Sequence, residues 1–121
     1  MAKSARVEAL PNMKPYFYRG KFTPALISTV CNDPDAFNRT MRASVQAFGG
    51  ALLNCRLEAF GADPIGFLEF PTDIAARSWN TFYASRKGVL ESKISRLLDD
   101  EDLKDMKKLV QASKRAPTAR R

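Results

Sequence analysis

Two acidic side chains, Glu58 and Glu69, fall in neighbouring predicted strands that a hairpin would join. If they face one another, they form a pair of carboxylates, which performs general acid–base chemistry when the two pKa values are driven apart. Arg56, Arg19 and Lys93 are predicted to lie close enough to neutralise them. Ion pairs of this kind are common on exposed sheet surfaces. The sequence therefore favours an ion-paired surface over a catalytic pair.

Other catalytic chemistry has little support. The chain contains no histidine, which is the commonest general base and metal ligand and the usual partner of a nucleophilic Ser or Cys. Cys31 and Cys55 lie far apart in different predicted elements, and we interpret both as small buried hydrophobic residues. Gly61 and Gly66 flank a turn and lack the lysine of a phosphate loop. We expect no metal and no cofactor, assign no catalytic residue, and favour a non-enzymatic role.

The composition is that of one globular domain. The 121 residues are 45% apolar and 27% charged, and no apolar run approaches the roughly 20 residues of a membrane span. The first twelve residues lack the apolar core of about 7–15 residues that a secretory signal requires. We therefore expect a cytoplasmic protein without a membrane partner.

The net charge of +7 is concentrated near the two ends of the chain. The basic residues of the ends are Lys3, Arg6, Lys14, Lys114, Arg115, Arg120 and Arg121. Short basic ends are more often solvated segments than nucleic-acid-binding tails. We predict a flexible arm over residues 1–14, a folded domain over 15–112 and a basic disordered tail over 113–121.

Periodicity and turn residues predict the order of elements within this domain. The expected elements are a strand over 16–22, a short helix over 24–30, a long helix from Asp33 to Gly49, strands over 51–59 and 65–70, a second long helix from Thr72 or Asp73 to Gly88, a strand over 90–98 and a last helix from Asp99. This β-α-β-β-α-β order is typical of an α+β, ferredoxin-like domain with a four-stranded antiparallel sheet and both long helices on one face. Leu103, Met106 and Val110 are expected to dock the extra C-terminal helix.

The strand over 65–70 is apolar on both sides, because Ile65 and Phe67 share one face while Leu68 and Phe70 share the other. Helices cover only one side, so the other is exposed to water, covered by another chain or occupied by a ligand, and the apolar residues favour a cover. The candidate ligand-contacting residues of this open face are Tyr16, Tyr18, Asn54, Arg56, Glu58, Phe67 and Glu69.

From Tyr16 to Leu109 the chain resembles the GYD-domain family, small bacterial proteins of largely unknown function related to dimeric α/β-barrels. The resemblance includes Asp33-Pro34-Asp35, Gly49-Gly50, Phe60-Gly61, Glu69-Phe70-Pro71, Ala75-Ala76, Gly88, Leu98 and Glu101. The tripeptide that names the family would fall at Gly61-Ala62-Asp63-Pro64, where no tyrosine is present. The resemblance implies a dimer formed through the sheet face and no established catalytic set.

Three functions remain open. The leading hypothesis is a homo-oligomeric domain whose open face binds a small molecule or protein partner. A second is a cofactor-free enzyme of the dimeric α/β-barrel type acting on a small aromatic or carbonyl compound. A third is single-stranded RNA binding, because Gly66 to Phe70 resembles part of an RNA-recognition consensus and aromatic residues on central strands can stack bases. Asp63-Pro64-Ile65 replaces the basic opening of that consensus, so nucleic acid is the less favoured partner.

Overall fold

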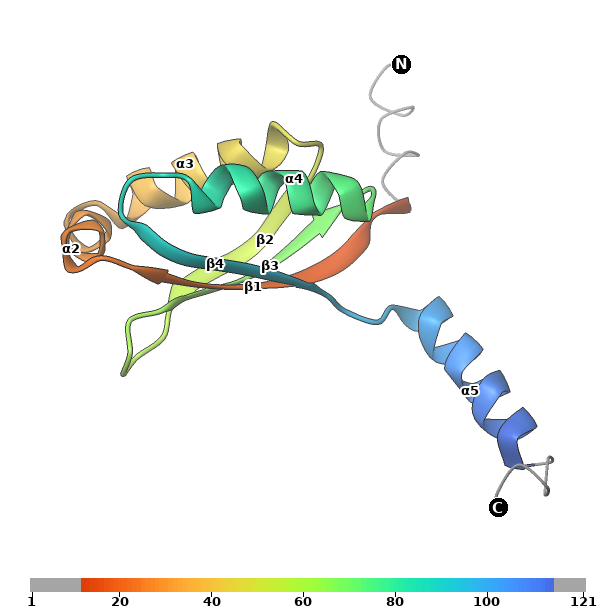
Figure 1. Ribbon diagram of the computed structural model, residues 1–121. Coiled ribbons are helices and arrows are strands. Elements are labelled where there is room, and N and C mark those ends of the chain that lie inside the picture. The colour runs from red at the N-terminus through yellow and green to blue at the C-terminus, as the bar shows by residue number, and fades with distance from the viewer. Residues whose placement is uncertain (1–11, 115–121) are drawn as a thin grey trace.

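A computed structural model describes residues 12–114 of the chain (Figure 1). The elements are β1 (Lys14–Phe22), α2 (Pro24–Asn32), α3 (Pro34–Gln46), β2 (Ala51–Leu57), β3 (Pro64–Phe70), α4 (Asp73–Ala84), β4 (Val89–Arg96) and α5 (Asp100–Lys114). The strands form one sheet in the order β2-β3-β1-β4, with every neighbouring pair antiparallel. Helices α3 and α4 lie side by side over one face (Figure 1). The predicted ferredoxin-like α+β class is confirmed.

Short polar side chains begin the helices where the sequence predicts. Thr23, Asp33 and Thr72 each accept a hydrogen bond from a backbone N–H of the first turn of α2, α3 and α4, respectively. These acceptors satisfy donors that a helix start leaves unpaired. Gly49 and Gly88 have φ values of +80° and +90°, a conformation that favours glycine where the chain leaves α3 and approaches β4.

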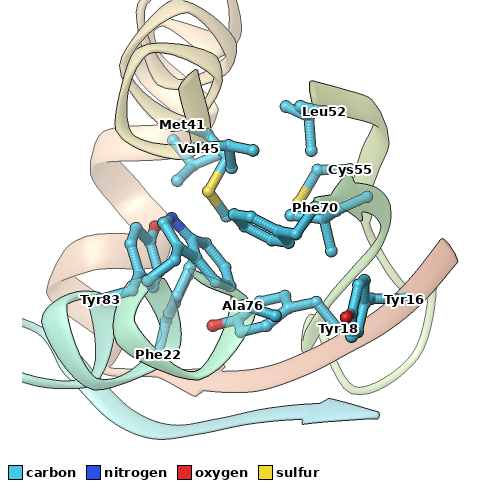
Figure 2. Packing of buried hydrophobic residues seen from close by; sticks show 13 residues of the cluster. Tyr16, Tyr18, Phe22, Met41, Val45, Leu52, Cys55, Phe70, Ala76 and Tyr83 are labelled. Atoms are coloured by element: carbon cyan, nitrogen blue, oxygen red, sulfur yellow. The ribbon is translucent and has the colours of Figure 1, made fainter. Parts of the chain in front are cut away.

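The core lies between the sheet and the two long helices, α3 and α4 (Figure 2). Trp79 of α4 is completely buried and stacks on Tyr83, with 5.2 Å between ring centroids and 19° between ring planes. Its indole Nε1 donates a hydrogen bond of 3.0 Å to Ser44 Oγ, so the one polar atom of the ring is paired inside the core. Cys55 is buried as expected, whereas Cys31 is exposed because it lies on the solvent side of α2.

The ends of the domain differ from the prediction. Lys14, expected in the N-terminal arm, begins β1, and α5 continues to Lys114. Helix α5 does not dock: it extends away from the sheet (Figure 1), and none of its residues is buried. The rest of the predicted arm and tail, residues 1–11 and 115–121, lies outside the described residues. Within 12–114, no helix is long and apolar enough to cross a membrane.

Candidate functional site

The open face of the sheet, opposite α3 and α4, carries the candidate site, but two of the predicted residues are not on it. Tyr16 and Tyr18 are buried on the helix side, with exposed fractions of 3% and 0%. In an all-aromatic run, alternation alone does not say which side points inward. The signal lay further along the strand, because the charged Arg19 and Lys21 share a face with Phe17 rather than with the tyrosines.

On the open face of β1, Phe17 lies where Tyr16 and Tyr18 were predicted to lie. It pairs with Phe67 across β1 and β3, the two central strands, and the ring centroids lie 5.5 Å apart at an interplanar angle of 56°. Phe67 is 44% exposed. Neighbouring aromatic side chains on a strand pair normally pack against a covering layer. Here no element of the described chain covers them.

The strand register arranges the open face in rows across the sheet. The aromatic row contains Asn54, Phe67, Phe17 and Ser95, and the cationic row beside it contains Arg56, Ile65, Arg19 and Lys93. Three positive charges therefore lie in one row, and like charges opposite one another in a sheet are destabilising. Only Arg19 of the three has an ion pair within the described chain, a contact of 3.6 Å with Asp63.

The predicted pair of Glu58 and Glu69 does not form. Leu57 pairs with Pro64, so that Glu58 lies at the turn end of the hairpin, whereas Glu69 pairs with Ala51 at the opposite end. A strand rises about 3.3 Å per residue, which leaves several residue lengths between the two carboxylates. They cannot share a proton, and acid–base chemistry through this pair is excluded.

A shallow cavity of about 210 Å³ lies on the open face. Its lining consists of Asn54, Arg56, Glu58, Ile65 and Phe67. The structure thus brings together four of the seven predicted site residues. Glu69 shares their face but lies outside the cavity, and Ile65 joins them because it is the cross-strand partner of Arg56.

The charges of the open face balance. The cations are Arg19, Lys21, Arg56 and Lys93, and the carboxylates are Glu58, Asp63, Glu69 and Glu91. The positive charge of the chain is therefore not gathered on this face. Among residues 12–114, no group of three or more His, Cys, Asp or Glu side chains is arranged to hold a metal ion.

A second, polar cleft of about 430 Å³ lies between α4 and β4. Tyr16 Oη donates a hydrogen bond of 2.6 Å to Asp73 Oδ1, and Arg96 Nε lies 3.9 Å from the same oxygen. Burial and the bond to Asp73 raise the pKa of Tyr16. Arg96 also contacts Asp102 at 3.0 Å. These groups satisfy one another and join β1, α4, β4 and α5, whereas Arg77, which also lines the cleft, has no ion pair within the described chain.

No family model, curated protein or solved structure matches the chain. The resemblance to the GYD-domain family therefore stays a prediction.

Proposed function

We propose that this protein is a homodimeric, GYD-type domain in which two copies pack through their open sheet faces. The observation that carries the proposal is the pair of Phe17, which is partly exposed, and Phe67, which is 44% exposed, at the centre of a face that no element of the described chain covers. Removing apolar surface from water is the main favourable term in protein association. A second copy brings the same aromatic pair, and face-to-face packing lets the side chains of two sheets interdigitate.

The balanced charge of the open face supports a second copy as the partner. A two-fold dimer places the same surface on both sides, so a strongly charged face would repel itself. Here four cations and four carboxylates cancel. A strongly acidic partner would meet as many carboxylates as cations.

The rows favour one orientation of the dimer. In this orientation the two-fold axis lies between the two sheets and runs along the aromatic row, perpendicular to the strands. The strands of the second copy then run opposite to those of the first. Glu69 and Ile65 lie two residues to either side of Phe67, so this axis puts Glu69 of one copy over Ile65 of the other. Glu69 then lies between Arg56 and Arg19 of the other copy. Its carboxylate supplies the negative charge that the cationic row lacks.

In this arrangement the second sheet closes the cavity beside Phe67. Arg56, Asn54 and Glu58 then become a few polar groups in an otherwise apolar enclosure, as in most small-molecule sites. The dimer is accordingly proposed to bind a small ligand that accepts hydrogen bonds from Arg56 and Asn54.

Light scattering at micromolar concentration tests the dimer. The expected mass is at least twice the 13.5 kDa of one chain. A mass of 13.5 kDa across the micromolar range would contradict the proposal, because the aromatic pair would then face water.

One observation favours a second function, single-stranded nucleic-acid binding. Phe17 and Phe67 lie on the two central strands, where aromatic rings of related sheets stack bases. Fluorescence anisotropy with a labelled single-stranded RNA at low salt separates the two functions. The dimer proposal predicts no salt-dependent binding, whereas binding that weakens steeply with salt would favour nucleic acid.

A further inference from the structure

Helix α5 carries an unpartnered apolar stripe. Leu103, Met106, Leu109 and Val110 fall on one side of the helix at helical spacing, with exposed fractions of 51%, 46%, 70% and 51%. A helix of about 15 residues is marginally stable in water without packing. The stripe therefore needs a covering surface, and the described body of the domain does not provide one.

Among residues 12–114, the side-chain bonds that fix α5 to the domain lie at its first turn. Asp99 Oδ1 accepts from the backbone N–H of Asp102, and Asp102 Oδ2 accepts from the N–H of Asp99 and from Arg96. These bonds set where the helix starts while leaving its apolar side free. The helix leaves the far end of β4 and extends clear of the sheet (Figure 1).

The charges of α5 are separated along its length. The first six residues contain four acids and one lysine, Asp100, Glu101, Asp102, Lys104 and Asp105, and the last nine contain Lys107, Lys108 and Lys114 without an acid. The net charges of the two halves are −3 and +3. Such a helix is complementary to an antiparallel copy of itself, since each acidic half then meets a basic half. A parallel copy would place acid against acid.

We propose that α5 pairs in antiparallel orientation with α5 of a second copy. The two stripes face each other with Met106 near the two-fold axis and Leu103 of one helix beside Val110 of the other. Opposed helix dipoles add to the complementarity. The contact is small, so it joins molecules only at higher concentration than the sheet-face dimer needs. It lies beyond the proposed function and does not depend on it, because the two interfaces share no residue.

Disulfide cross-linking tests the pairing and its direction in the full-length chain. Leu103→Cys and Val110→Cys are made separately in a Cys31→Ser background, because Cys31 is exposed, while the buried Cys55 is kept. Mild oxidation of a mixture should give the 103–110 product in several-fold excess over either self-linked product. Predominant 103–103 linkage would overturn the antiparallel arrangement, and no linkage at all would overturn the pairing.

Sedimentation velocity over a concentration series provides a second readout. Met106→Glu/Val110→Glu should abolish the additional association at high concentration. Gln111→Glu/Ala112→Glu adds the same charge on the other side of the helix and should leave that association unchanged. Equal effects of the two double variants would overturn the proposal. Phe67→Lys separates the two interfaces: it should remove the sheet-face dimer and leave the 103–110 cross-link intact, so failure of one interface is distinguishable from failure of the other.

Discussion

The centroid of the Phe17 ring lies 5.5 Å from that of the Phe67 ring, across the two central strands and on the sheet face opposite α3 and α4. The same two strands send Tyr16, Tyr18 and Phe70 into the core on the other side. The central strands are thus apolar on both faces, as in sheets that are covered on both sides. The pair of Phe17 and Phe67 is the main support for the proposal of a sheet-face dimer.

Charge reversal at the proposed contact should weaken the dimer and a second reversal should restore it in part. Arg56→Glu and Glu69→Lys each place like charges together between copies, whereas the double variant recreates an attractive pair with its signs exchanged. Close interfacial charge pairs show couplings of about 1.5 kcal/mol or more. The dimer dissociation constant, measured by sedimentation equilibrium at low salt, should therefore rise in each single variant and recover in part in the double variant, where Arg19 still lies beside position 69.

Lys93→Glu serves as a comparison, because Lys93 lies in the same row but two strands away from Ile65. It should weaken the dimer less than Arg56→Glu. If the effects of Arg56→Glu and Glu69→Lys on the free energy of dimerisation simply add in the double variant, the orientation in which Glu69 lies over Ile65 is ruled out.

The three tyrosines should ionise only when the domain unfolds. All three are buried, and burial raises the pKa of Tyr18 to about 12 and the pKa values of Tyr16 and Tyr83 as well. The folded chain therefore keeps these protons above pH 10, where the unfolded chain releases them. Stability is then fully present below about pH 10 and falls as the pH rises toward the folded values.

Absorbance at 295 nm and circular dichroism, followed together from pH 9 to 13, check this expectation. The tyrosinate signal should rise in the same transition in which the helical signal is lost. A tyrosine that titrates near pH 10 while the helical signal is intact would contradict its buried position.

Gly20 makes room for the hydroxyl of Tyr18. A Cβ at position 20 would overlap Tyr18 Oη and lie 2.9 Å from Tyr18 Cζ. Overpacking of a core typically costs about 1–3 kcal/mol, so Gly20→Ala should lower the free energy of unfolding by that order. Tyr18→Phe removes the overlapping oxygen and should reduce the cost of Gly20→Ala.

Urea denaturation of the two single variants and the double variant measures this coupling. Tyr18→Phe alone should be nearly neutral, since the buried Tyr18 Oη has no hydrogen-bond partner within the described chain. Independent effects of the two substitutions would show that the ring and the glycine do not share this space.

The fold was predictable because its signals are local. Thr23, Asp33 and Thr72 mark helix starts through hydrogen bonds to the next turn, and the alternation after Ala51 identifies a strand from a few residues. The site was less predictable. The aromatic run Tyr16-Phe17-Tyr18 does not itself say which side faces inward, and only the charged Arg19 and Lys21 further along β1 indicate it.

The position of helix α5 could likewise not be predicted from the sequence. The stripe of Leu103, Met106 and Val110 predicts correctly that the segment is an amphipathic helix, but periodicity does not say which surface the stripe meets. The pairing of Glu58 with Glu69 failed for a different reason. Strands joined by a turn pair residues at similar distances from that turn, so Glu58, the neighbour of Leu57, which pairs with Pro64, lies far from Glu69.

Sedimentation equilibrium of the wild-type chain beside Phe67→Lys and Ile74→Lys tests the central claim most directly. Ile74 is an exposed apolar residue of α4, away from the open face, so its substitution is a matched control. At low micromolar concentration, the wild type and Ile74→Lys should be dimers, and Phe67→Lys should be a folded monomer. A monomeric wild type, or a Phe67→Lys variant that dimerises as tightly as the control, would contradict the sheet-face dimer.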